Sequence, residues 1–254
     1  ADHLIDLRSK KESNSKPRFY AQYLLLMAIM GITWYLSSGI AMMIFLSISA
    51  FHFGQSQWLG INLQSPLNYF LYLSWGMLIL STLIFFNLQQ CIELINSIGW
   101  DFTTKWFNGS VWTSVLGISV LLVSALLTYS WRTEKIDAQQ IMVEVAFILL
   151  LLVLSVSTDV LFSFAVYFGV WHSTKALVLE YDFLNSLVKT PKHFVLQLIP
   201  YTLVSLIGLF SLYFIFKLYL PQVSIYMVMF VLISILTVPH LLIMHPLYES
   251  KERI

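Results

Sequence analysis

The sequence predicts an all-α polytopic membrane protein, a bundle of about eight transmembrane helices. Of its 254 residues, 58% are hydrophobic and only 11% are charged, whereas about a quarter of the residues in soluble domains are charged. The apolar residues also fall in runs about as long as the ~20 residues that cross a hydrocarbon core, separated by short polar breaks. We therefore expect a single transmembrane helical domain over residues 1–254 that is solvated by a lipid bilayer.

The apolar runs give the elements in chain order. The expected spans are residues 20–36, 38–58, 66–86, 109–130, 139–155, 158–181, 194–217 and 222–248. The segment 87–107 is amphipathic and carries tryptophan, so it is predicted to lie along the membrane interface instead of crossing it. The chain begins at Ala1, and His3 stands where the middle of a motif would be. We expect one more segment before residue 1.

The composition excludes several classes of function. The net charge is +1, and the basic residues lie in loops between apolar runs, so no face is available for a nucleic acid. Cys91 is the single cysteine. A disulfide within the chain, a CxxC zinc site and an iron–sulfur cluster are therefore excluded, and histidine and carboxylate remain as metal ligands.

The distribution of lysine and arginine predicts the orientation, because cytoplasmic loops carry the excess of these residues. The loop before the first span carries Arg8, Lys10, Lys11, Lys16 and Arg18. With strict alternation of eight spans, Arg132, Lys135, Lys189, Lys192, Lys251 and Arg253 fall on the same side, and Lys105 and Lys217 fall opposite. This distribution predicts that the first loop and the C-terminus are cytoplasmic.

Four of the six histidines are predicted to reach one depth in the cytoplasmic half of the membrane: His3, His52, His172 and His240. His52, for example, lies six residues before the end of its span, at a depth of ~9 Å. Taken singly, each could be a hydrogen-bonding residue between helices. Together they favour a shared metal ion, because polar side chains in a membrane face the bundle interior and need partners there.

The other two histidines fit such a site less well. His193 follows Pro191 at the start of a span, where a structural role at the membrane interface is expected. His245 follows His240 by five residues, about 140° further around a helix, so the two should not share one metal. We expect His245 at most to support a ligand from outside the coordination shell.

Glu144 lies at about the same level as the histidines. A carboxylate at this depth costs ~2.5 kcal/mol or more on insertion unless it has a partner. One role is to accept a hydrogen bond from a ligand histidine, which fixes the tautomer that binds the metal. The alternative is an ion pair with Lys135 or Lys175.

Four short motifs carry a resemblance to a known family. FHFG (51–54), YFGVWHS (167–173) and TVPH (237–240), preceded by DH (2–3), resemble the Brp/Blh family of bacterial membrane β-carotene 15,15′-dioxygenases over nearly the whole chain. The resemblance implies a multi-pass helical protein of the bacterial inner membrane with a histidine-bound non-haem iron, Fe(2+). It also implies cleavage of β-carotene by O₂ at the central double bond into two retinals, and a functional link to a microbial rhodopsin.

The resemblance assigns the metal-binding and catalytic roles to His3, His52, His172 and His240, each matched to a histidine of the family's motifs. Three positions depart from the family pattern. Gln57 stands where an aspartate is common, Ala176 where a second histidine is common, and His245 where another aspartate is common. If that second histidine is a ligand in relatives, this chain completes its site with His240 or has an altered activity.

β-Carotene has no polar group, so an enzyme must recognise it by shape and apolar contact in a long tunnel. The expected substrate-binding residues are aromatic side chains beside the histidines: Phe51, Phe53, Tyr167, Phe168 and Trp171. Their ring faces could also stabilise positive charge on the polyene. The alternative is that they are ordinary packing residues between helices.

Two functions of other classes stay open. A non-catalytic membrane protein that binds a carotenoid or retinal fits the three departures. A bis-histidine haem protein for electron transfer could pair His52 with His172, although this leaves His3 and His240 unexplained. A membrane desaturase or hydroxylase needs the HxxxH and HxxHH clusters of a di-iron site, and the sequence has neither.

Overall fold

The computed structural model describes residues 16–58, 61, 63, 65–96, 108–184, 190–219 and 225–252. All regular elements in these ranges are helical, which confirms the predicted all-α class. They are α2 (Lys16–Leu36), α3 (Ser38–Gln57), α4 (Ser65–Phe86), α5 (Leu88–Asn96), α7 (Gly109–Arg132), α8 (Ala138–Ser157), α9 (Val160–Val166), the π-helix η1 (Tyr167–His172), α10 (Ser173–Leu184), α11 (Pro191–Tyr219) and α12 (Ile225–Glu252).

Side-chain caps stabilise the starts of several helices. Asn108 accepts a hydrogen bond from the backbone N–H of Val111 at the start of α7. Asp137 and Asp159 do the same at the starts of α8 and α9. Each cap satisfies an N–H group that the first helical turn leaves without a partner, which would be costly near a membrane.

Five helices in the described ranges are long and apolar enough to cross a membrane. They are Ser38–Gln57, Pro66–Phe86, Gly109–Arg132, Ala138–Ser157 and Pro191–Tyr219. Shorter apolar stretches occur at Tyr20–Leu36 and Val228–Leu241. The predicted span 158–181 is divided between α9, η1 and α10, because the π-helical turn interrupts it. The predicted count of about eight spans is therefore not confirmed.

The helix α5 is amphipathic, as predicted for the segment that contains it. Cys91 and Ile95 are buried on one side, and Gln89 and Glu93 are exposed on the other. The rest of that segment, residues 97–107, lies outside the described residues.

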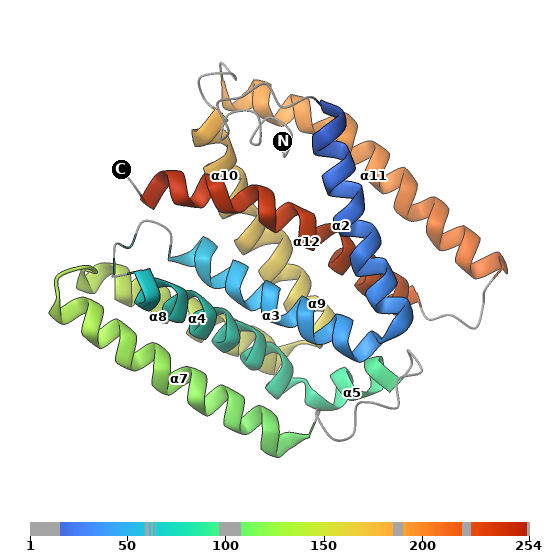
Figure 1. Ribbon diagram of the computed structural model, residues 1–254. Coiled ribbons are helices and arrows are strands. Elements are labelled where there is room, and N and C mark those ends of the chain that lie inside the picture. The colour runs from blue at the N-terminus through green and yellow to red at the C-terminus, as the bar shows by residue number, and fades with distance from the viewer. Residues whose placement is uncertain are drawn as a thin grey trace.

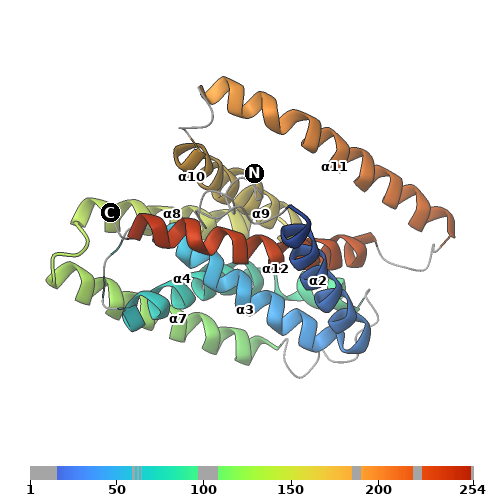
Figure 2. The same cartoon turned by 45° about the horizontal axis from the view of Figure 1, so that its top comes forward.

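The helices pack in layers around α3 and α4 (Figure 1). α3 packs against α4, and α4 in turn packs against α7, α8 and α9. On the other side α12 packs against α2 and α3, and Trp34 of α2 donates a buried hydrogen bond to Ser234 of α12. α11 lies outermost (Figure 2), with Phe194 as its buried residue.

The closest approach in the bundle is between α3 and α4, and two glycines permit it. A Cβ on Gly54 would overlap the backbone carbonyl of Tyr72, and a Cβ on Gly76 would overlap that of Ala50. Small residues of this kind let membrane helices approach closely. This contact at Gly54 holds α3 against α4 two residues after His52.

Candidate functional site

Three of the four histidines that were predicted to share a site lie together. The ring centre of His52 is 5.1 Å from that of His172 and 5.9 Å from that of His240. They come from α3, η1 and α12, which are far apart in the chain. His52 and His172 are buried, and His240 is half-buried. His3 lies outside the described residues, and so does the side chain of His245.

His172 owes its position to the π-helix η1. The wider turn of a π-helix is frequent at functional sites because it redirects side chains within an otherwise regular helix. Here it places Trp171 beside Phe147 of α8, with the rings stacked at 4.4 Å. His172 itself faces His52 of α3. The neighbouring residues Trp171 and His172 therefore contact two different helices, α8 and α3.

The hydrogen bonds of Ser56 indicate the tautomer of His172. The Ser56 hydroxyl donates to the carbonyl of Phe53 at 3.0 Å, and its oxygen lies 3.3 Å from Nδ1 of His172. If the hydroxyl proton stays on the carbonyl of Phe53, the oxygen accepts from Nδ1–H of His172. His172 then carries its lone pair on Nε2, the atom that could bind a metal.

The spacing of the three rings is compatible with one shared metal. Metal–nitrogen bonds of about 2.1 Å place the centres of two coordinating imidazoles roughly 5–6 Å apart. Neutral imidazoles also suit iron and zinc as ligands. In the described part of the chain, however, no group of three histidine, cysteine or carboxylate side chains is already arranged around one point. The rings would have to rotate to direct their nitrogens to a common ion.

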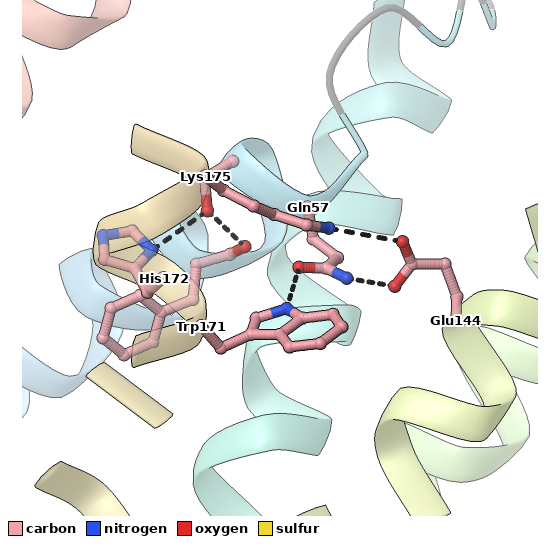
Figure 3. A network of polar contacts seen from close by, with 7 residues as sticks. Gln57, Glu144, Trp171, His172 and Lys175 are labelled. Carbon is pink, nitrogen blue, oxygen red and sulfur yellow. Dashed lines mark hydrogen bonds and ion pairs between the residues drawn. The ribbon is translucent and has the colours of Figure 1, made fainter. Parts of the chain in front are cut away.

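A partly buried polar network lies beside the histidines and joins α3, α8, η1 and α10 (Figure 3). The indole N–H of Trp171 donates to Oε1 of Gln57 at 3.2 Å, and the amide of Gln57 donates to Glu144. The ammonium of Lys175 lies 3.5 Å from the other carboxylate oxygen of Glu144 and 5.3 Å from the centre of the Trp171 ring.

Glu144 reaches the predicted level in the bundle, yet its hydrogen bonds among the described residues go to Gln57 and Lys175 instead of to a histidine. Of the two roles considered from the sequence, the ion pair with Lys175 is the one present. Gln57, which departs from the family pattern, is the link between this carboxylate and Trp171. Gln57 thus connects Glu144 to Trp171, the residue that precedes His172.

Two of the predicted aromatic residues border the histidines. The ring of Phe53 meets His172 edge to face with centres 5.0 Å apart, and the ring of Phe168 stacks on His172 at 5.5 Å. Tyr167 is buried and packs against Phe53 at 5.1 Å.

The other two have packing roles. Phe51 contacts Tyr69 and Tyr72 of α4, each with ring centres 6.0 Å apart. Trp171 belongs to the polar network. For these two, the alternative of ordinary helix packing fits the structure better than contact with a substrate.

An apolar cavity lies next to Phe53, which contacts His172. It contains about 810 Å³ of empty space, including its open side, and lies between α3, α4, α5, α9 and α12. Its lining comprises Met42, Phe45, Leu46, Ser49, Phe53, Leu80, Leu83, Ile84, Cys91, Leu94, Ile95, Val160, Leu161, Phe164 and Phe230. Phe53 is shared by the cavity and the histidine cluster.

The sequence reasoning missed most of these lining residues. On α3 they follow a helical spacing that was available as a signal, because Met42, Phe45, Ser49 and Phe53 share one face of the helix. The contribution of α5 had no such signal, since an amphipathic helix at an interface and one that closes a cavity have the same pattern.

The comparisons with known proteins give one match. A family model described as beta-carotene 15,15'-dioxygenase matches residues 1–248. No curated protein and no solved structure matches the chain.

Proposed function

The chain belongs to the β-carotene 15,15′-dioxygenase family, and from this premise we propose that it cleaves β-carotene with O₂ at the central double bond to give two retinals. The proposed cofactor is Fe(2+) held by His3, His52, His172 and His240. The observation that carries the proposal is the meeting of three of these histidines beside Phe53, which also lines an apolar cavity.

The reaction needs no further reactant. The central C=C bond breaks, and each of its two carbons takes one oxygen atom of O₂ to become an aldehyde. Iron, when bound, would supply the activation of O₂, which reacts poorly with an alkene alone. The chain's own residues have to hold the iron, position the polyene and exclude water.

Several described residues suit these tasks. Burial of His52 and His172 among aromatic rings favours neutral imidazoles, which have a lone pair to donate. The contact with Ser56 would favour the tautomer of His172 that presents Nε2 when the hydroxyl donates to Phe53. Phe53 and Phe168 cover one side of His172, where they would exclude water and offer ring faces to positive charge on the polyene.

The test is a metal and product analysis of the purified protein. We expect iron as the bound metal, and retinal from β-carotene under air but not under nitrogen. Protein that is loaded with iron and binds β-carotene but yields no aldehyde would instead support the non-catalytic binding protein. A haem absorption band would support the electron-transfer alternative.

A second experiment concerns the polar network. We expect Glu144→Gln, which can still accept a hydrogen bond, to retain iron with reduced turnover. Glu144→Leu should lose more of both, because Gln57 and Lys175 then lack their common partner. Loss of such a supporting contact costs about 10–100-fold in affinity or activity. Iron content and retinal formation are measured on the same preparations.

The two substitutions separate the possible roles of Glu144. Wild-type turnover in Glu144→Leu would show that the carboxylate has only a structural role, as the partner of Lys175. Complete loss of iron in Glu144→Gln would make it a metal ligand.

We propose further that the protein lies in the bacterial inner membrane with the histidines toward the cytoplasm, where its retinal would supply a microbial rhodopsin. The distribution of lysine and arginine supports this orientation. In whole cells a membrane-impermeant maleimide should label Gln89→Cys on α5 but not Gln139→Cys at the start of α8, and inverted vesicles should give the reverse.

The native Cys91 should not react with the maleimide, so it adds no background to the labelling. Burial raises the pKa of the Cys91 thiol to about 12, so the reactive thiolate is almost absent at neutral pH. Labelling of Gln139→Cys from outside the cell would invert the proposed orientation.

A further inference from the structure

We propose that Trp171 is a positioning residue: its contacts with α3, α8 and α10 fix the direction in which His172 leaves the π-helix η1. The inference rests on the proposed function and deepens it, because it identifies what directs one of the proposed metal ligands. Trp171 itself would touch neither the metal nor the substrate. It acts through the stretch of backbone that it shares with His172.

The π-helical turn decides where His172 points. A π-helix forms i→i+5 hydrogen bonds and is rare, appearing mostly as a single turn within an α-helix. In η1 the backbone N–H of Ser173 donates to the carbonyl of Phe168, five residues earlier, and the Ser173 hydroxyl donates to the same oxygen at 2.6 Å. The turn holds one residue more than an α-helical turn, so the side chains that follow are rotated by about 100° from their places in a regular helix.

Trp171 is held from three directions. Its ring stacks on Phe147 of α8, with ring centres 4.4 Å apart and planes 19° apart. Its indole N–H donates to Oε1 of Gln57, the last residue of α3, at 3.2 Å. Nζ of Lys175 in α10 lies 5.3 Å from the ring centre. Phe147 and Gln57 are buried, so neither can move without disturbing the packing around it.

The hydrogen bond to Gln57 adds a direction that stacking alone lacks. Stacked rings can slide and turn within their planes, whereas a hydrogen bond weakens steeply when it is bent. Glu144 orients the amide of Gln57, because the NH₂ group donates to its carboxylate and Oε1 is left for Trp171. A carboxylate only accepts and an indole only donates, so an amide turned by 180° would lose both contacts.

Fixing Trp171 also fixes His172, because neighbouring residues of one helical turn differ by a set rotation. Figure 3 shows Trp171 directed toward Gln57 and Glu144, and His172 directed away from them. His172 thereby meets His52, with ring centres 5.1 Å apart. If the turn relaxed to an α-helix, Trp171 and His172 would rotate together. The contacts of Trp171 therefore oppose the rotation that would turn His172 away from His52.

Ordinary helix packing would not need the polar part of this arrangement. An apolar side chain at position 57 would pack against the indole without loss of hydration, whereas the amide of Gln57 and the carboxylate of Glu144 both have to leave water. A buried polar network that is satisfied makes its surroundings rigid and selects one arrangement. That is the property which a positioning role for Trp171 requires.

The test measures the metal site in two variants of position 171. Trp171→Leu removes both the stack and the hydrogen bond, and Trp171→Phe keeps an aromatic ring against Phe147 while removing the N–H group. The purified chain is stripped of metal and titrated with Fe(2+) under nitrogen. It is also titrated with Co²⁺, whose visible absorption reports the number and geometry of its ligands. Retinal formation under air is measured on the iron-loaded samples.

We expect Trp171→Leu to bind Fe(2+) about 10–100-fold more weakly, as for the loss of other residues that orient a ligand, and to change the Co²⁺ spectrum. Trp171→Phe should restore much of the affinity and remain weaker than the wild type by roughly 2–10-fold, the effect of one neutral hydrogen bond. A merely structural tryptophan would lower the melting temperature of the metal-free Trp171→Leu protein and leave the Co²⁺ spectrum of the folded protein unchanged.

Trp131→Leu is the matched control, because it makes the same replacement at a side chain of α7 that is 54% exposed. It should keep the wild-type iron affinity, Co²⁺ spectrum and retinal yield. If Trp171→Leu does not fold, Trp171→Phe decides alone, since it keeps the ring that packs against Phe147. Wild-type iron affinity in Trp171→Phe would then overturn the inference.

The outcomes separate this inference from the function on which it rests. Wild-type iron affinity and a wild-type Co²⁺ spectrum in both variants of Trp171 would overturn the positioning role and leave the proposed function intact. An equal loss of affinity in Trp131→Leu would also overturn it, since any lost tryptophan would then have the same effect. No aldehyde from iron-loaded wild-type protein would overturn the proposed function, whereas a changed metal site in the Trp171 variants would still support the positioning role.

Discussion

Alanine at position 52 is expected to remove most of the bound iron and to lower retinal formation at least 100-fold. His52 is the ring that lies next to both His172 and His240, and at 3% exposure no water can easily replace its nitrogen. Loss of a direct ligand should exceed the 10–100-fold effect of a supporting residue. Elemental analysis and chromatography of retinal on the same purified protein measure both effects. His172→Ala should behave in the same way.

The matched control is His193→Ala. His193 is exposed at the start of α11 and lies 3.0 Å from the side chain of Gln197. Iron and retinal should equal those of the wild type. Full iron content in His52→Ala or His172→Ala would show that this cluster does not bind the metal. Loss of iron in His193→Ala would show that the metal is bound elsewhere in the protein.

Replacement of Gly54 or Gly76 by alanine should be among the most destabilising single changes in the protein. The added Cβ meets a backbone carbonyl in each case, and a backbone atom cannot turn away as a side chain can. Overpacking of this kind costs about 3 kcal/mol, which lowers the melting temperature by roughly 10 °C in a chain of this size. Gly54→Ala should also lose iron, because the displaced helix carries His52. Thermal unfolding in detergent measures the stability.

Gly117→Ala provides the control within the same protein. Gly117 lies in α7 with no atom within 4 Å of its Cβ position, so alanine there should stabilise the helix by up to ~1 kcal/mol. A melting temperature of Gly54→Ala equal to that of Gly117→Ala would show that α3 and α4 are not in the close contact described here.

The meeting of three candidate histidines was predictable from the sequence, because it follows from counting residues along the apolar runs. His52, His172 and His240 were placed at one level by such counting, and their rings lie together. Glu144 was placed at the same level, and it does lie beside this cluster.

The direction in which a side chain points was less predictable. Depth along a helix says nothing about rotation around the bundle axis, so the choice between a histidine and Lys175 as the partner of Glu144 stayed open. The π-helical turn at His172 adds a rotation that no hydrophobic pattern records. For the same reason the predicted span 158–181 was drawn as one helix, whereas it is three helical segments.

One short stretch of α3 makes its contacts in several directions at once. His52 faces His172 and His240, Phe53 lines the cavity and Gly54 touches α4. Ser56 contacts His172, and Gln57 accepts a hydrogen bond from Trp171.

Deleting one residue upstream within α3 would turn this whole stretch by about 100° and shift it by 1.5 Å, so all these contacts would fail together. The same deletion in α11, whose one buried side chain is Phe194, would displace little. Insertions and deletions should therefore be tolerated far better in α11 than in α3. The length of α3 has to be kept unchanged in any engineered variant, because its contacts depend on one register.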